Sequence, residues 1–243
     1  ALTRCLMART QTVERGVPLI EAGDAPADIF VVLQGWACSI RPSRDGRPPI
    51  VAFHVPGDIC DLGALMKRQM DCTIVALGKL RVAALSRSSI ARLTHDNPEC
   101  AQALWWEYMC ASAIRSQWVA RLSNGSARSR IANLICELAV RLYVVGLADD
   151  DGFDLPVTQT DIGNSCGLTP EHTNRVFRDL RADRIVRWEK GHLSLIDWDL
   201  LRETAGFDAT YLHFRDLKAS EVRAPPPLAN PTSAPIALDA RRI

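Results

Sequence analysis

The stretch from Thr158 to Arg187 constrains the fold of this chain more strongly than any other part of the sequence. Residues 159–165 predict a short helix that ends at Cys166-Gly167, because glycine readily adopts the left-handed backbone of a helix-ending turn. Thr169-Pro170-Glu171 then combines a capping side chain, a proline suited to the first helical position and an acidic residue in the first turn. A second helix is therefore predicted to begin here.

The second predicted helix has an apolar face and a polar face. Val176, Phe177 and Leu180 fall at helical spacing and form the apolar face. Two short helices joined by a tight glycine turn, with a polar face on the second, indicate a helix-turn-helix whose second helix, at about residues 169–182, enters the major groove of DNA. The candidate DNA-contacting residues are Thr169, Pro170, Glu171, His172, Asn174, Arg175 and Arg178.

The polar face also fits a second interpretation. Glu171 and Arg175 are spaced i, i+4, as are Arg175 and Asp179, so they would form a solvated row of salt bridges worth roughly a few tenths of a kcal/mol per pair. The residues that follow favour DNA binding, because two short β-type runs, 183–188 and 193–196, flank a turn that contains Gly191. Such a hairpin is the wing of a winged helix.

The order helix, turn, helix, hairpin resembles the DNA-binding domain of the cyclic-AMP receptor protein and fumarate-nitrate regulator superfamily. In those regulators the second helix begins with serine or threonine and continues with Glu-x-x-x-Arg, and here Thr169, Glu171 and Arg175 take these positions. The resemblance implies that Arg175 binds a guanine, that Glu171 accepts a hydrogen bond from a cytosine, and that Asn174 adds a contact. It implies an inverted repeat with half-sites of the TTGA or TGA kind, centred about one helical turn apart.

The composition of the chain limits the kinds of partner that it can bind. Its 243 residues, 47% hydrophobic and 23% charged, fit two modest globular domains. No segment has the apolar length of a membrane span, and the first residues lack the apolar core of a signal peptide, so no membrane partner and a cytoplasmic location are expected. A net charge of +1 excludes nucleic-acid binding by bulk charge. It does not exclude DNA binding by a local basic patch, since residues 115–141 contain five arginines and a single acidic residue, Glu137.

The first 97 residues predict a β jelly roll after a short helical lead. Apolar runs at 29–33, 36–40 and 50–55 alternate with turns that contain glycine or proline. Short strands at this spacing predict a sandwich or barrel. The positions of the turn residues resemble those of cyclic-nucleotide-binding domains; these residues are Gly23, Gly35, Gly46 and Pro56-Gly57-Asp58.

The loop that would bind a nucleotide departs from the pattern of that family. Binders use glycine amides, a glutamate for the ribose, and an arginine followed by serine or threonine for the phosphate. Here Asp71-Cys72-Thr73 stands in place of that last pair, so a carboxylate would face an anion. Lys67 and Arg68 are expected to be solvated. The resemblance therefore implies a sensor-like domain that binds neither cyclic AMP nor cyclic GMP, and its effector is unknown.

A long helix is predicted from residue 98 to about residue 125, with apolar residues on two sides. One side, with Trp106 and Ile114 on it, suits packing against the barrel. The other runs through Leu104 and steps by four and three, which is typical of a two-helix seam. In the resembling family this helix pairs with its twin in a homodimer, although packing within one chain remains the alternative. The candidate dimer-interface residues are Tyr108, Ala111, Arg115, Trp118 and Leu122.

The chain is therefore predicted to have an α+β fold in four parts. A cyclic-nucleotide-binding-like barrel spans residues 1–97, a long dimerisation helix 98–125, a winged helix-turn-helix domain 126–217, and a disordered proline-rich tail 218–243. Ser126 caps the first helix of the third part, which runs to about Val145. Asp149-Asp150-Asp151 lacks the spacing of a calcium loop and is interpreted as a solvated turn. Asp197 caps a further helix after the wing.

Three alternatives concern the chemistry of the barrel. A cupin-type metal enzyme needs clustered histidines, but His54 and His95 are far apart in sequence. Thiol redox sensing through Cys38, Cys60 or Cys72 stays open, as does effector-independent DNA binding. Neither a metal nor a cofactor is expected, because the eight cysteines form no C-x-x-C pair.

The sequence thus predicts a homodimeric, sequence-specific regulator of transcription, not an enzyme. Its expected partners are double-stranded DNA, a second copy of the chain and RNA polymerase. The regulated genes, and the choice between activation and repression, are not indicated.

Overall fold

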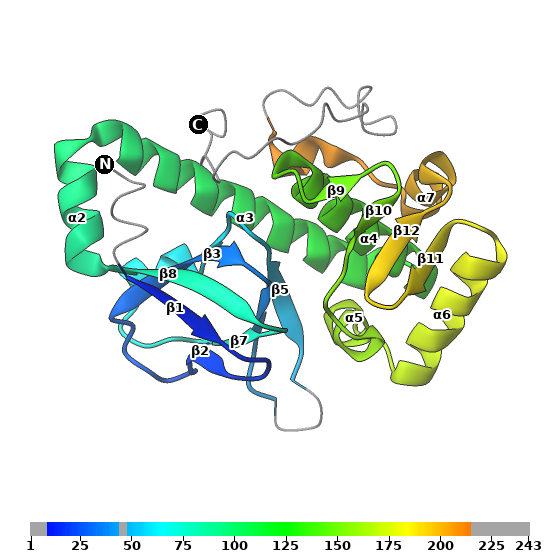
Figure 1. The fold of residues 1–243 in the computed structure, drawn as a ribbon, viewed down its shortest axis with the longest axis horizontal. Coiled ribbons are helices and arrows are strands. Elements are labelled where there is room, and N and C mark those ends of the chain that lie inside the picture. Colours follow the sequence, from blue (N-terminus) through cyan, green and yellow to red (C-terminus); the bar gives the residue numbers. More distant parts are fainter. Residues whose placement is uncertain (1–8, 44–47, 215–243) are drawn as a thin grey trace. The chain divides into compact units, whose positions relative to one another are not determined.

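The computed structural model describes residues 9–43 and 48–214 (Figure 1). The chain forms two compact units, of which the first ends at Ser112 and the second begins at Ala113, inside the long helix α3 (Pro98–Asn124). The predicted disordered tail at 218–243 lies outside the described residues.

The first unit contains two four-stranded antiparallel sheets, which confirms the predicted jelly roll. One sheet has the order β1-β8-β3-β6, formed by Thr10–Val13, Leu80–Ser86, Asp28–Gln34 and Ile59–Cys60. The other has the order β2-β7-β4-β5, formed by Pro18–Ile20, Thr73–Ala76, Ala37–Ile40 and Ile50–His54. Except for the consecutive pair β4 and β5, neighbouring strands in the sheets are far apart in sequence, so the fold forms only when distant segments pair.

The helical lead predicted before the barrel is wrong for the described residues. Residues 10–13 form β1, which pairs with β8 in the register Thr10↔Ala83 to Val13↔Leu80. Local sequence does not reveal this partner, since it lies some 70 positions further along the chain, and strand formation depends strongly on such context.

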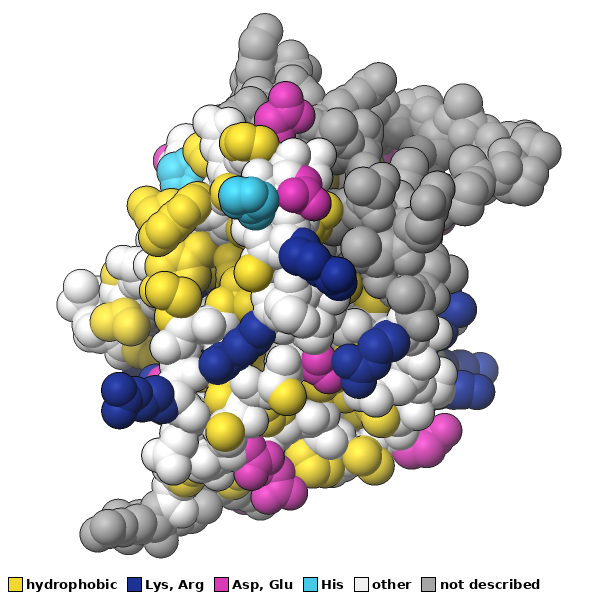
Figure 2. All heavy atoms as spheres, turned by 90° about the vertical axis from the view of Figure 1, so that its left-hand side faces the viewer, with side chains coloured by type: hydrophobic (Ala, Val, Ile, Leu, Met, Phe, Trp, Pro, Cys, Tyr) yellow, Lys and Arg dark blue, Asp and Glu magenta, His cyan; other side chains and the backbone are white. Residues whose placement is uncertain are grey.

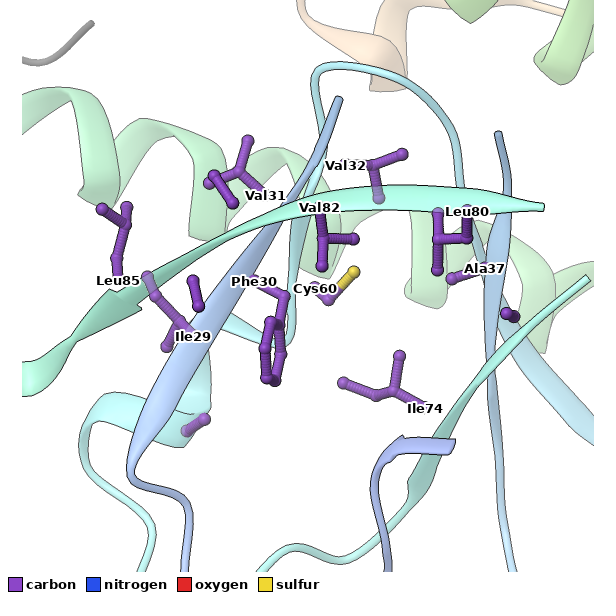
Figure 3. Packing of buried hydrophobic residues seen from close by; sticks show 14 of the residues in the cluster. Ile29, Phe30, Val31, Val32, Ala37, Cys60, Ile74, Leu80, Val82 and Leu85 are labelled. Atoms are coloured by element: carbon purple, nitrogen blue, oxygen red, sulfur yellow. The ribbon is translucent and has the colours of Figure 1, made fainter. Parts of the chain in front are cut away.

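The core of the first unit lies between the sheets and beneath the helices. All residues from Ile29 to Val32 on β3 are buried, because both faces of this strand are covered. Figure 3 shows Phe30 on one side of β3, near Ile74 of the opposite sheet, and Val31 on the other. Leu104 of α3 packs against the same cluster. A strand covered on both sides needs an apolar run rather than strict alternation.

One short helix lies within the barrel, and two helices follow it, of which α3 was predicted. A short 3-10 helix, η1 (Leu62–Leu65), lies in the loop after β6. Helix α2 (Arg87–Asp96) begins at Ser86, whose side chain accepts a hydrogen bond from the Ser89 amide. Helix α3 has no fully buried residue along its 27 positions. In the part of the chain that the structure describes, no helix combines the length and hydrophobicity needed to cross a bilayer.

The second unit is built around α4 (Ala127–Val144), which Ser126 caps as predicted. Every residue from Ile131 to Leu142 is buried, because neighbouring elements cover the helix on several sides. These are α5 (Gln159–Cys166), α6 (Pro170–Ala182), α7 (Trp198–Ala205), η2 (Ala209–Leu212) and the sheet β11-β12-β10-β9.

The small sheet contains the predicted wing and a hairpin that the sequence did not reveal. The wing is β11 (Val186–Glu189) and β12 (His192–Leu195). The acidic segment interpreted as a plain turn links β9 (Ala148–Asp149) to β10 (Gly152–Asp154), which pairs with β12. Its turn is held by the Asp149 carboxylate, which accepts from the Asp151 and Gly152 amides at 3.0 and 3.2 Å.

Candidate nucleic-acid interface

Side-chain caps define the two helices of the predicted helix-turn-helix. At the start of α5 the Thr158 hydroxyl accepts from the Asp161 amide at 3.1 Å, and the Asp161 carboxylate accepts from the Thr158 amide at 2.7 Å. This reciprocal pair satisfies two amides that the helix leaves without partners. The helix ends at Gly167, with a φ of 65°. Thr169 then caps α6 by accepting from the His172 amide at 3.3 Å.

Close contact between α5 and α6 depends on Gly163, which sequence reasoning did not single out. A Cβ at this position would lie 2.6 Å from the Thr173 hydroxyl oxygen and 3.3 Å from the Leu168 carbonyl oxygen. Thr173 is fully buried, and its hydroxyl donates to the Thr169 carbonyl at 2.9 Å. A glycine inside an otherwise regular short helix is the signal that marks such an approach.

The structure brings all seven predicted DNA-contacting residues to one helix and its cap. Val176, Phe177 and Leu180 are buried. Pro170 is partly buried, and the other six are exposed: Thr169, Glu171, His172, Asn174, Arg175 and Arg178. The separation of faces matches the sequence pattern, while contact of each residue with DNA stays a prediction.

The salt-bridge interpretation of this face is not realised. Within the described residues Arg175 and Arg178 are exposed, and neither takes part in an ion pair with Asp179. The arginine of α6 that does pair is Arg181, which contacts Glu189 of the wing at 3.0 Å. Two guanidinium groups therefore remain available on the exposed face of the second helix.

The wing is fixed to α6 by aromatic packing. The rings of Phe177 and Trp188 lie 5.0 Å apart between centroids. The turn between the wing strands consists of Lys190 and Gly191, both with positive φ, at 52° and 82°. Two consecutive left-handed residues give the turn that matches the twist of a tight hairpin.

Of the five arginines in residues 115–141, for which the sequence left a local basic patch open, four are engaged within the second unit. Arg130 donates to the carbonyl oxygens of Gly125 and Cys166 at 2.8 and 3.2 Å, and Arg128 pairs with Asp183 at 2.6 Å. Arg141 is buried against Glu137. These arginines hold the unit together. Figure 2 shows a different face of the molecule, on which basic side chains are scattered among hydrophobic and acidic ones.

The loop of the barrel that would hold a phosphate is closed by its own ion pairs. Lys67 Nζ lies 2.6 Å from a carboxylate oxygen of both Asp61 and Asp71, and Arg41 lies 2.6 Å from the other Asp71 oxygen. The expectation that Lys67 is solvated is therefore wrong. The hydrogen bond from Lys67 lowers the pKa of the Asp71 carboxyl. Burial opposes ionisation of Lys67, but its hydrogen bonds to Asp61 and Asp71 outweigh this and raise its pKa.

The barrel offers little support for metal or thiol chemistry. Ligand atoms of Asp61, Asp71 and Cys72 lie within 4.8 Å of one another, but the Lys67 ammonium already bonds to both carboxylates. Among the described residues neither histidine of the cupin alternative joins a group of this kind. His54 shares a 2.7 Å hydrogen bond with Ser39 instead.

The cysteines considered for redox sensing are all buried. Cys38, Cys60 and Cys72 lie in the barrel core. Burial raises the pKa of the Cys60 thiol and that of the Cys72 thiol. Because the thiolate is the reactive form, these environments suit structural cysteines rather than sensors.

The residues predicted for a dimer seam on α3 differ in their surroundings within one chain. Leu104 packs on its own barrel, and the indole N–H of Trp118 donates to Glu137 of the same chain at 2.9 Å. Of the other predicted residues, Ala111 is partly buried, whereas three are exposed: Tyr108, Arg115 and Leu122. The most exposed large apolar side chains lie one position further along, on Trp105, Met109 and Val119, at 67%, 60% and 64%.

A β jelly roll followed by a long helix and a winged helix-turn-helix defines a two-domain DNA-binding regulator. Residues 10–97 match the cyclic nucleotide-binding domain family, and residues 129–204 match the Crp-like helix-turn-helix domain family. The chain belongs to the cyclic-AMP receptor protein and fumarate-nitrate regulator superfamily, as the resemblance implied.

Relatives in this superfamily are similar along most of their length. Transcriptional activator protein FnrL of Cereibacter sphaeroides is 26% identical over 203 residues, which cover 82% of this chain and 81% of that protein. The Anaerobic regulatory protein of Haemophilus influenzae is 26% identical over 207 residues, covering 84% and 79%. Their names identify regulators, and the two matched domain families make this chain a transcription regulator of the same superfamily with a helix-turn-helix DNA-binding domain.

Solved structures share the fold. FixK2 from Bradyrhizobium japonicum matches with a TM-score of 0.75 at 23% identity, covering 84% of this chain and 100% of that one. The c-di-GMP responsive global regulator CLP of Xanthomonas campestris matches with a TM-score of 0.63 at 16% identity, covering 78% and 94%. At these identities the match concerns architecture alone.

Proposed function

We propose that the protein acts as a homodimer that binds an inverted repeat in double-stranded DNA through α6, without a requirement for a cyclic nucleotide. The observation that carries the proposal is the exposed face of α6. Arg175 and Arg178 point away from the core and have no ion-pair partner in the described structure. A DNA target also assigns the protein to the cytoplasm, the compartment of the bacterial chromosome.

Base recognition is assigned to three side chains of α6. The guanidinium of Arg175 has the fork geometry to bind N7 and O6 of a guanine, and the Glu171 carboxylate accepts from a cytosine amino group. Asn174 donates to the Pro170 carbonyl at 3.1 Å in the DNA-free protein, so its amide exchanges this bond for a base contact. The family resemblance further implies half-sites of the TTGA or TGA kind, about one helical turn apart.

Selection of bound sites from random duplex DNA tests the proposal. We expect the purified protein to recover an inverted repeat. Replacement of Arg175 by alanine should cost roughly 1 to 3 kcal/mol and relax the preference at the contacted guanine. Arg181→Ala is the matched control, because Arg181 lies on the same helix but pairs with Glu189. Equal loss of base preference in both variants, or recovery of no motif, would contradict the assignment.

Independence from cyclic nucleotides is proposed from the closed loop of the barrel. A bound phosphate would face the carboxylates of Asp61 and Asp71, and the one lysine between them is already paired with both. Titration calorimetry with cyclic AMP and with cyclic GMP should show no binding at micromolar concentration. Site selection without nucleotide should give the same motif, whereas a motif recovered only with nucleotide would reverse this part of the proposal.

Dimerisation is proposed through the exposed apolar face of α3. Trp105, Met109 and Val119 lie on this face, and the predicted residues Tyr108 and Leu122 flank it. Their spacing is close to the 3–4 pattern of a two-helix seam, and exposed apolar rows of this kind mark interfaces. Light scattering should give the mass of two chains.

RNA polymerase is proposed as a further partner because FnrL is named a transcriptional activator. Transcription from a promoter that carries the selected site tests this partner.

A further inference from the structure

A small cavity lies within the second unit, between the last turns of α3, the start of α4 and the end of α5. Its volume is about 20 Å³, which is enough for one water-sized occupant, since roughly 10 to 15 Å³ suffices for a water molecule. The polar groups around it come from Arg121, Arg130, Asn133 and Ser165, and Trp118 contributes an apolar wall. No residue of the DNA-contacting face lines this cavity.

Asn133 has an unsatisfied hydrogen-bond donor at this cavity. Its side chain is 1% exposed, and its Nδ2 atom has no hydrogen-bond partner among the described residues. A buried amide that lacks an acceptor costs about 1 to 3 kcal/mol, so an unsatisfied group of this kind indicates an occupant that accepts hydrogen bonds.

The charged groups that line the cavity are two guanidinium groups, of Arg121 and Arg130; the Glu137 carboxylate interacts electrostatically with Arg121 but does not line the cavity. Arg130 donates to two backbone carbonyls, of Gly125 and Cys166. Arg121 donates to the Ala205 carbonyl at 3.5 Å, and to the Gln117 amide oxygen at 3.0 and 3.2 Å in the amide orientation that satisfies both groups. Neither arginine forms an ion pair within the described part of the chain.

Glu137 is the acidic residue closest to this arrangement in sequence, one helical turn beyond Asn133, but it does not line the cavity. Its carboxylate accepts from Trp118, Tyr211 and Arg141. This carboxylate also acts on Arg121 electrostatically, but one carboxylate stands against the three guanidinium groups of Arg121, Arg130 and Arg141, so positive charge remains in excess around the cavity.

We propose that this cavity is a binding site for a single small anion of the size of chloride. Its unsatisfied group is a donor, its flanking charges are positive, and its volume admits one atom. The Ser165 hydroxyl donates to the Ile162 carbonyl, so its own proton is already engaged. Water would satisfy Asn133, but only an anion also balances Arg121 and Arg130.

The anion would join three helices of the second unit. One of these, α5, is the first helix of the helix-turn-helix. The turn after it lies close by, since a Cβ at Gly167 would be 3.5 Å from Leu122 and 3.9 Å from the Arg130 guanidinium. Occupation of the cavity therefore stabilises the attachment of α5 to α3 and α4.

Thermal unfolding of the full chain without DNA tests this site independently of the proposed function. Sodium chloride is titrated against the sodium salt of a bulky sulfonate at constant ionic strength, so that general screening does not change. We expect a saturable rise in Tm of about 2 to 4 °C with chloride. No rise, or a rise that does not saturate, would overturn the proposal and leave water as the occupant.

The variant Asn133→Asp supplies a fixed negative charge of nearly the same shape as the amide. Its Tm should be higher than that of the wild type without chloride and should not respond to chloride. Asn97→Asp is the matched control, because Asn97 ends α2 in the first unit, and it should keep the full response. An equal chloride response in Asn133→Asp would contradict the site.

Bromide provides a readout that does not depend on a variant. Wild-type crystals equilibrated with bromide should show an anomalous peak within hydrogen-bond distance of Asn133 Nδ2. A cavity without that peak at high bromide would exclude the anion even if the variant fails to fold.

Discussion

Glu137 is the residue whose role differs most from its appearance in the sequence. There it is the lone acidic residue in a basic stretch. In the structure its side chain is fully buried and accepts from Trp118 at 2.9 Å, Arg141 at 3.1 Å and Tyr211 at 3.2 Å. It connects α3, α4 and η2 within the second unit. The local pattern reveals only the pair with Arg141, four positions away, because the other two donors, Trp118 and Tyr211, lie 19 and 74 positions away.

Removal of Glu137 should strongly destabilise the second unit. Glu137→Ala leaves the Arg141 guanidinium, whose side chain is 7% exposed, without its carboxylate. Breaking a buried pair in this way costs roughly 3 to 5 kcal/mol. Chemical denaturation measures the loss. Glu189→Ala is the control: it removes an exposed pair with Arg181 and should cost less than about 1 kcal/mol. Similar losses in the two variants would contradict the structural role of Glu137.

The ionisation of Glu137 makes the stability of the unit depend on pH. Burial raises the pKa of the Glu137 carboxyl, although its hydrogen bonds and Arg141 oppose this. The folded state therefore retains a proton that the unfolded state releases above its ordinary pKa of about 4.3. The contribution of this group is greatest below that pH and declines as pH rises through the folded-state pKa. The measurement is the free energy of unfolding of the wild type minus that of Glu137→Gln. This difference should fall from pH 4 to pH 7. If it rises instead, the pKa of Glu137 is not raised in the folded state.

At the scale of elements, structure that depends on local signals was predictable and structure that depends on distant pairing was not. The predicted caps at Ser126 and Thr169 and the stop at Gly167 all act within a few residues, and the helices begin and end where these residues indicate. Strands β1, β9 and β10 were missed because each exists only through its partner in the sheet.

Gly163 provides a test of the close contact between α5 and α6. Gly163→Ala places a Cβ 2.6 Å from the buried Thr173 hydroxyl oxygen, so one of the helices must shift. Overpacking of this kind costs roughly 1 to 3 kcal/mol, and it should lower DNA affinity as well, since α6 moves. Gly78→Ala is the control, because a Cβ there meets nothing within 4 Å and the backbone is not left-handed. Equal unfolding midpoints for both variants would show that the contact tolerates a methyl group.

For the whole molecule, the sequence predicted the order of domains and the family, but not which face of α3 is left uncovered. Periodicity alone could not decide this, because the helix carries apolar residues on both sides. Which face is covered depends on the packing of Leu104 on the barrel and on the hydrogen bond from Trp118 to Glu137. Both bury positions that the predicted seam used. The exposed face that remains runs through Met109, one position away from Tyr108.

A charge at Met109 should therefore separate the dimer and weaken DNA binding together. Met109 is 60% exposed in one chain, so Met109→Glu should leave the folded monomer intact. A second copy cannot pack against the charge without desolvating it, so light scattering should show one chain at micromolar concentration. A monomer reads one half-site, and affinity for the inverted repeat should fall by roughly 10²-fold or more, to that of a half-site. Met66→Glu makes the same change at a 90% exposed methionine of the barrel loop and should remain dimeric. If Met109→Glu dimerises as tightly as Met66→Glu, the dimer uses another surface, and the spacing of the two recognition helices must be set elsewhere.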